Sequence, residues 1–204
     1  MVGRGHGMSV LVGLIRHGAH DDLGTWLSGR TRDIALNAAG RDETAALAQR
    51  LVWRGISGIA ASPRRRTAET AEILGHELGV TPVPAGALDE IDFGAWSGAR
   101  FADLDGDPAW RHWNAARGTA PTPGGETMAT AVSRAVAHLD ELALQGDGPI
   151  LCVSHCDVIR GVIAHALGLS LDNILRFEID PASVSWVMAH GQGIAHVLTI
   201  NGRE

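Results

Sequence analysis

Arg16, His17 and Gly18 stand directly after an apolar run, Val10–Ile15, and His20 follows two residues later. A neutral imidazole can act as a nucleophile near pH 7, and a guanidinium group binds anions such as phosphate. An Arg-His-Gly tripeptide also arises by chance in about one chain in ten of this composition. A tripeptide that arose by chance would be part of a solvated turn. Its chemistry therefore depends on the partners that the rest of the chain supplies.

Two other apolar runs end in residues of the same kind. The run Ile56–Ala61 leads into Ser-Pro-Arg-Arg-Arg at 62–66, and Pro149–Ser154 leads into His-Cys-Asp at 155–157. Ligands of open α/β sheets bind at the carboxyl ends of the strands, so the three segments are expected to converge there. Two arginines and two histidines at one sheet edge predict a site for an anionic group, most simply a phosphate.

The apolar spacing predicts short buried strands that alternate with amphipathic helices. We expect strands at Val10–Ile15, Ile56–Ala61 and Pro149–Ser154, helices from Asn37 to about Trp53, from Ser62-Pro63 to about Leu78, around 100–116, over 126–144 and over His155–Gly168, a loop at 81–99, and a final hairpin of Ser183–Ala189 and Ile194–Ile200. This order indicates an α/β fold, a three-layer sandwich with a mainly parallel central sheet flanked by helices.

Composition narrows the classes of function. The 204 residues are expected to form one domain, 1–204, with 1–8 as a loose N-terminal extension. A net charge of −6 argues against a nucleic-acid partner, which requires an excess of basic surface. All 17 basic residues are arginine, and the absence of lysine excludes a Walker-type P-loop, Schiff-base chemistry and a lysine general base.

Hydropathy and cysteine content bear on the compartment. No apolar run approaches the ~20 residues that a membrane span needs, so no membrane partner is expected. Cys152 and Cys156 make no disulfide framework, and their C-x3-C spacing is not the redox C-x-x-C motif. We therefore expect a cytoplasmic protein, with Cys152 as a small core residue. The sequence does not define the oligomeric state and leaves a homodimer open.

Four segments, in this order, resemble the motifs of the histidine phosphatase superfamily, in its phosphoglycerate-mutase-like group. They are RHG at 16–18, SPRRRTAET at 62–70, LDEIDFGAWSG at 88–98 and VSHCDVIR at 153–160, and PGGET at 123–127 resembles a further family segment. The resemblance covers most of the chain. It implies a phosphoglycerate-mutase-like fold and phosphoryl transfer through a phosphohistidine, with no cofactor and no metal.

The resemblance also implies roles for five residues. His17 would be the nucleophile that takes the phosphoryl group, which water then removes. Arg16, Arg66 and His155 would bind the substrate and stabilise charge on the phosphoryl oxygens, and Glu90 would protonate the leaving alkoxide. The motif selects Arg66 among three consecutive arginines, and the other two are expected at the solvated surface.

Two alternatives stay open for these residues. Asp89 and Asp92 flank Glu90, and Asp92 is the second candidate for the general acid. A metal site could instead be built from five potential ligands, His17, His20, Asp21, His155 and Cys156. Neighbouring arginines disfavour the metal site because they repel a cation and attract an anion.

Three residues depart from the family's pattern. His20 stands where threonine is usual, Leu23 where asparagine often follows, and Cys156 where glycine follows the second histidine. Threonine and asparagine at these positions help to hold the phosphate, so those contacts are lost or supplied differently here. We expect His20 and Cys156 to contact the substrate.

Other polar and aromatic residues receive structural interpretations. Three arginines could contact a second anionic group, but the solvated surface is the expectation for Arg30, Arg111 and Arg117. We expect packing for Trp96 and exposed helix positions for His112 and His138.

The leading hypothesis is a histidine acid-type phosphatase that hydrolyses a phosphomonoester of a small metabolite. The alternatives are a phosphoglycerate-type mutase and a catalytically weak phosphate-binding module. Mutases of the family carry a longer segment between the acid and the second histidine, whereas Glu90 and His155 are only 65 positions apart, which favours hydrolysis. The three departures would support a binding module, but the retained His17 and Glu90 argue against it.

Overall fold

The computed structural model describes residues 9–145 and 148–203, so the extension expected at 1–8 lies outside the described residues. The strands are β1 Val10–Arg16, β2 Gly58–Ala61, β3 Pro82–Pro84, β4 Ile150–Ser154, β5 Val184–Ala189 and β6 Ile194–Gly202. The α-helices are α1 Ala38–Leu51, α2 Arg65–Leu78, α3 Phe101–Leu104, α4 Pro108–Ala115, α5 Met128–Gln145 and α6 Cys156–Ala166. Short 3₁₀ helices cover Val52–Arg54, Gly86–Leu88, Gly94–Trp96 and Leu171–Arg176. Within the described residues no helix is both long enough and apolar enough to cross a membrane.

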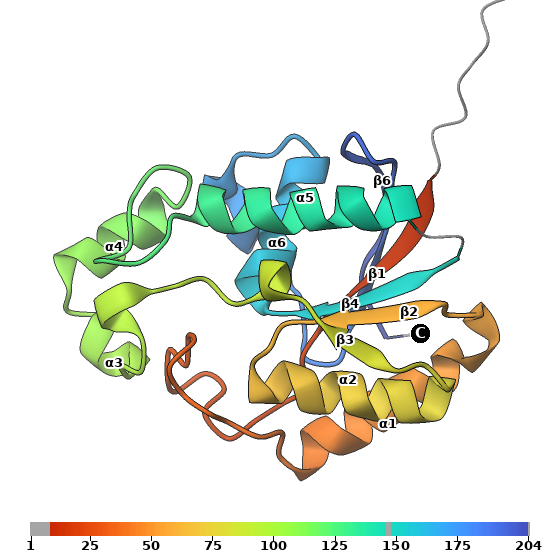
Figure 1. Ribbon diagram of the computed structural model, residues 1–204. Helices are drawn as coiled ribbons and strands as arrows, with labels where there is room; N and C mark the ends of the chain where they lie inside the picture. Colours follow the sequence, from red (N-terminus) through yellow and green to blue (C-terminus); the bar gives the residue numbers. More distant parts are fainter. Residues whose placement is uncertain (1–8, 146–147, 204) are drawn as a thin grey trace, which may run out of the picture.

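The strands form one sheet in the order β3-β2-β4-β1-β5-β6 (Figure 1). β1, β4, β2 and β3 run parallel, and β5 and β6 add an antiparallel hairpin beside β1. Helices α1 and α2 cover one face of the sheet, and α5 and α6 cover the other. The predicted α/β sandwich with a mainly parallel central sheet is confirmed.

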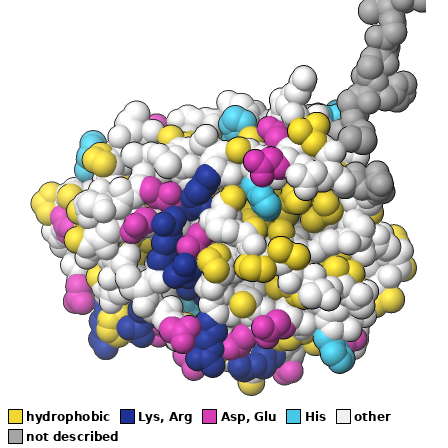
Figure 2. Space-filling model, in the orientation of Figure 1, with side chains coloured by type: hydrophobic (Ala, Val, Ile, Leu, Met, Phe, Trp, Pro, Cys, Tyr) yellow, Lys and Arg dark blue, Asp and Glu magenta, His cyan; other side chains and the backbone are white. Residues whose placement is uncertain are grey.

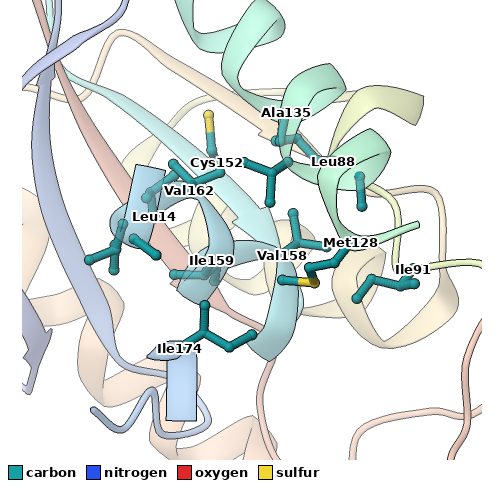
Figure 3. Close-up of a cluster of buried hydrophobic side chains, with 14 of the residues drawn as sticks. Leu14, Leu88, Ile91, Met128, Ala135, Cys152, Val158, Ile159, Val162 and Ile174 are labelled. Carbon is teal, nitrogen blue, oxygen red and sulfur yellow. The ribbon is translucent and has the colours of Figure 1, made fainter. Parts of the chain in front are cut away.

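Side chains of the central strands alternate between two layers of core, as the two-residue period of a strand requires. Ile15 of β1 belongs to the cluster under α1 and α2, whereas Val12 and Leu14 belong to the cluster under α5 and α6. Figure 3 shows the second cluster, in which Leu14 and Cys152 lie among side chains of the helices. Cys152 is fully buried, as predicted. Burial on both faces explains why β1 and β4 read as continuous apolar runs.

Most predicted elements are present, and the differences lie in the connections. Asn37 caps α1 as predicted, because its side-chain oxygen accepts a hydrogen bond from the Gly40 amide. The loop prediction for 81–99 is wrong at β3, which pairs with β2 at the edge of the sheet. The helix expected around 100–116 is two helices, α3 and α4, and Asp107 caps the second.

The segment that follows β1 rests directly on the start of α1. A Cβ atom on Gly18 would lie 2.6 Å from the carbonyl oxygen of Gly40 and 2.8 Å from Oγ1 of Thr44. The Gly18 amide also donates a hydrogen bond to Oγ1 of Thr70 in α2, at 3.1 Å. Glycine is therefore required at position 18 because the backbone approaches α1 too closely for any side chain.

Candidate active site

The carboxyl end of β1 opens on a cavity of about 590 Å³. Arg16 and His17 border this cavity at the end of β1, and Arg66 borders it from the first turn of α2. Glu90 reaches it from the segment after β3, and Cys156 from the start of α6. The structure therefore brings together the three strand ends that the sequence predicted to converge.

His17 is 4% exposed and its ring is held in one tautomer. Its Nδ1 lies 2.9 Å from the carbonyl oxygen of Gly18, and Nδ1 donates because a carbonyl only accepts. The lone pair of the neutral ring is therefore on Nε2. Burial, together with the positive charges of Arg66 and Arg16, holds the pKa of His17 well below its usual value of 6.5. The ring is consequently neutral at neutral pH, and its unprotonated Nε2 is available as a nucleophile.

Arg16 and Arg66 are held by backbone carbonyl groups and keep further donors free. Nη1 of Arg16 donates to the oxygen of Ile179 at 2.6 Å, and Nη2 of Arg66 donates to the oxygen of Gly29 at 3.0 Å. Nε of Arg16, and both Nε and Nη1 of Arg66, are buried with no hydrogen-bond partner among the described residues. Charged donors buried in this way favour an anion as their partner.

His155 lies completely buried behind the cavity, in contact with Arg66. Nη2 of Arg66 donates to His155 Nδ1 at 3.0 Å, since a guanidinium group cannot accept a hydrogen bond. The ring proton is therefore on Nε2, which donates to Oγ of Ser62 at 2.8 Å, and Ser62 in turn donates to Asp89 at 3.2 Å. Burial, with the nearby positive charge of Arg66, lowers the pKa of His155, which keeps the ring neutral.

Glu90 is the carboxyl group of its segment that borders the cavity. Its Oε2 lies 3.7 Å from Nη2 of Arg66 and 3.5 Å from Nδ1 of His155. Burial raises the pKa of Glu90 to about 7, although the charge of Arg66 acts in the opposite direction. Asp89 lies behind it in the hydrogen-bond chain of His155, and the side chain of Asp92 is 44% exposed. Glu90 is therefore the better placed of the three candidate acids.

The residues that depart from the family's pattern also border the cavity. The ring of His20 is buried, with its centroid 5.2 Å from that of His17, and its Nδ1 has no hydrogen-bond partner among the described residues. Burial lowers the pKa of His20 to about 4 and raises the pKa of the Cys156 thiol to about 11. Leu23 is 38% exposed at the mouth. His20 and Cys156 thus reach the cavity as neutral side chains.

The cavity wall also contains Arg117, whose buried position was not predicted from the sequence. Arg117 is 6% exposed, and its Nη1 lies 2.6 Å from Oδ2 of Asp157. Its guanidinium carbon lies 4.1 Å from the ring centroid of Trp113. The prediction of solvated surface for Arg117 is therefore wrong. Asp157 lies inside the VSHCDVIR segment, but its partner is 40 residues away along the chain, so no local pattern signals the pair.

A network of ion pairs surrounds the segment that carries Glu90. Arg30 donates to the Glu90 carbonyl oxygen at 2.7 Å and to Glu126 at 2.6 Å, and Nη2 of Arg64 lies 2.9 Å from Asp89. The solvated-surface prediction is therefore wrong for Arg30 and Arg64. Figure 2 shows arginine and acidic side chains intermingled in a band down one face of the molecule. These pairs fix the acidic segment at the edge of the cavity.

The other residues for which we stated an expectation from the sequence lie outside the cavity. Arg65, Arg111 and His112 are exposed, as predicted. Trp96 is buried and packs edge-to-face on Trp110, also as predicted. His138 was expected to be exposed and is instead half-buried in α5. Among the residues that the structure describes, no group of three or more His, Cys, Asp or Glu side chains is arranged to hold a metal ion.

The comparison with protein families agrees with this geometry. The model of the histidine phosphatase superfamily (branch 1) matches residues 12–201. The chain therefore belongs to the histidine phosphatase superfamily.

Two curated relatives come from Mycobacterium tuberculosis. An acid phosphatase is 32% identical over 197 residues, which cover 93% of this chain and 92% of the relative. A bifunctional protein is 31% identical over 197 residues, which cover 92% of this chain and 52% of the relative. The chain thus spans about half the length of the bifunctional protein.

Two solved structures share the fold. A mycobacterial glucosyl-3-phosphoglycerate phosphatase has a TM-score of 0.84 and 26% identity, and the match covers 95% of this chain and 99% of that one. A phosphoserine phosphatase from Entamoeba histolytica has a TM-score of 0.80 and 23% identity over 95% of this chain and 97% of that one. The second similarity is one of fold alone.

Proposed function

We propose that the chain acts, as one catalytic domain, as a phosphatase that hydrolyses a phosphomonoester of a small metabolite through a phosphohistidine on His17. One juxtaposition carries this proposal. A neutral imidazole, arginine donors with no hydrogen-bond partner in the described part of the chain and a carboxyl group of raised pKa all border one cavity. The similarity to an acid phosphatase and to a glucosyl-3-phosphoglycerate phosphatase supports hydrolysis over simple phosphate binding.

In the first step the Nε2 lone pair of His17 attacks phosphorus. A P–N bond forms while the P–O bond to the alcohol breaks. Arg16 and Arg66 donate hydrogen bonds to the phosphoryl oxygens, over which negative charge is spread in the transition state. Glu90 gives its proton to the leaving oxygen, which departs as a neutral alcohol. His155 positions Arg66 through the bond at its Nδ1.

In the second step water removes the phosphoryl group. The carboxylate of Glu90 takes a proton from water, the water oxygen attacks phosphorus, and the P–N bond breaks. Inorganic phosphate leaves, and His17 returns to its neutral form. A pKa of about 7 suits Glu90 to both tasks because each protonation state is well populated near neutral pH.

The direct test is to trap the intermediate. Turnover of para-nitrophenyl phosphate is quenched within the first seconds, and the peptide that contains His17 is analysed by mass spectrometry. We expect a phosphoryl group on His17 that disappears once the substrate is exhausted. Turnover with the phosphoryl group on a different residue would contradict the proposal.

Replacement of Glu90 by glutamine is expected to act most strongly on substrates with poor leaving groups. For alkyl phosphates, kcat/KM should fall about 10²- to 10⁴-fold, because the leaving alkoxide no longer receives a proton. For para-nitrophenyl phosphate the loss should be much smaller, since that leaving group departs as an anion. Steady-state kinetics with an alkyl and an aryl ester measure the difference.

The dependence of kcat/KM on pH gives a second test of the role proposed for Glu90. The donor form of Glu90 is lost as the pH rises through about 7, so wild-type kcat/KM for alkyl phosphates should fall above this pH. The Glu90→Gln variant should lack this alkaline limb. Asp92→Asn is the matched control, because it makes the same change on a partly exposed neighbour. Equal losses for both esters, or the same leaving-group dependence in Asp92→Asn, would exclude Glu90 as the acid.

A further inference from the structure

Beyond the residues proposed to act at phosphorus, a group of polar side chains borders the same cavity. We call this group the paired-charge wall, and its members are Asn114, Arg117, Asp157, Arg160, Glu178 and Asp180. Apolar and aromatic side chains form much of the rest of the lining, with Trp26, Phe101 and Trp110 among them. The cavity therefore has room and surface for an organic group in addition to a phosphate.

Each arginine of the paired-charge wall already has an acidic partner. Nη1 of Arg117 lies 2.6 Å from Asp157, and Nη2 of Arg160 lies 2.6 Å from Glu178. Arg160 also approaches Asp157, at 3.8 Å. Pairing leaves the wall rich in hydrogen-bond donors and acceptors but poor in net charge.

The charged side chains that line the whole cavity are also balanced in sign. Four arginines and four acidic side chains line it. In the proposed function, Arg16 and Arg66 neutralise the phosphate. A second anionic group would then meet three carboxylates of the wall and arginines that are already paired, and such like-charge contacts are costly. A cationic group would meet carboxylates that are already paired, Asp180 among them, whose Oδ2 lies 3.0 Å from Nη2 of Arg203.

We propose that the paired-charge wall binds an uncharged, polyhydroxylated group, so that the substrate is the phosphomonoester of a neutral sugar or polyol. Hydroxyl groups donate to carboxylates and accept from guanidinium groups, and bonds to charged partners are the stronger ones. This inference rests on the proposed phosphatase activity. It makes the Arg117–Asp157 pair the element that excludes substrates with a second anionic group.

Three sugar phosphates test the inference because all share a primary C6 oxygen as the leaving group. Glucose 6-phosphate is neutral beyond its phosphate, 6-phosphogluconate adds a carboxylate, and glucosamine 6-phosphate adds an amine. We expect kcat/KM for glucose 6-phosphate to exceed that for 6-phosphogluconate by about tenfold or more, with glucosamine 6-phosphate also below glucose 6-phosphate. Higher or equal kcat/KM for 6-phosphogluconate would overturn the inference.

Asp157→Asn leaves Arg117 without its acidic partner and removes one negative charge from the wall. We expect the ratio of kcat/KM for 6-phosphogluconate to that for glucose 6-phosphate to rise about tenfold. The ratio is measured within one protein sample, so it stays readable if part of the variant is unfolded. Glu178→Gln, which removes the nearer acidic partner of Arg160, should shift the ratio in the same direction.

Asp103→Asn is the matched control, since it makes the same change on exposed α3. Its ratio should equal that of the wild type. An unchanged ratio in both Asp157→Asn and Glu178→Gln would overturn the role of the wall. Hydrolysis of para-nitrophenyl phosphate that depends on His17, without turnover of any of the three sugar phosphates, would reject the inference and leave the phosphatase proposal intact. Absence of His17-dependent hydrolysis of the aryl ester would reject both.

Discussion

Replacement of His17 by alanine is expected to lower kcat/KM for every phosphomonoester substrate by about 10⁴-fold or more. Alanine removes the only atom that we propose to bond with phosphorus, and the arginine donors that remain can bind substrate but cannot accept the phosphoryl group. The KM should change much less than kcat, because binding rests mainly on Arg16 and Arg66. Steady-state assays of phosphate release, with substrate far above and far below KM, separate the two parameters.

The control for His17→Ala is His76→Ala, because His76 is an exposed histidine on α2 with its side chain 85% exposed. This variant should retain wild-type kcat/KM. Circular dichroism of both variants verifies that they fold. Hydrolysis that survives in folded His17→Ala at more than about a tenth of the wild-type rate would exclude His17 as an obligatory nucleophile.

Arg66→Lys is expected to lower kcat/KM by about 10²- to 10³-fold, even though it conserves the charge. Arg66 bonds to Gly29 and His155 through Nη2 while Nε and Nη1 stay available, and an ammonium group cannot reproduce this fork. Inhibition by inorganic phosphate should weaken along with turnover, because the same donors bind product.

The neighbouring arginine supplies the control. Arg65→Lys makes the same change one position away, on an exposed side chain that pairs with Glu69 at 2.9 Å. It should leave both turnover and phosphate inhibition unchanged. Wild-type phosphate affinity in Arg66→Lys would show that Arg66 does not contact the phosphoryl oxygens.

The fold was predictable wherever a pattern is local. β1 and β4 are buried on both faces, so their residues form uninterrupted apolar runs. Asn37, a typical N-cap residue, indicates where α1 begins. β3 was missed because Pro82 and Pro84 are unfavourable in most strands. At the edge of a sheet proline is tolerated, since one side of the strand needs no ladder partner. Only the tertiary structure places this segment at an edge.

The residues that we propose to contact the phosphoryl group were predictable for a related reason. Its residues follow strand ends, and the topology of a parallel sheet brings strand ends together. No such topological rule brings together the residues of the paired-charge wall. Arg117 lies after α4 and Asp157 in α6, so their ion pair forms only in the tertiary structure. An isolated arginine in a sequence is normally solvated, which is why the prediction failed for this buried one.

The contact of Gly18 with the start of α1 ties catalytic competence to a particular local unfolding event. Backbone atoms of Gly18 and Ala19 meet the backbone of Gly40 and the Asn37 amide, so the loop that carries His17 and His20 rests on the first turn of this helix. Fraying of that turn would release the loop without disturbing the sheet, and helix ends open at much lower free energy than core strands. We therefore expect the chain to lose the position of His17, the proposed nucleophile, well below the temperature at which it melts, and hydrogen exchange at the Gly40 amide to report the loss before circular dichroism does.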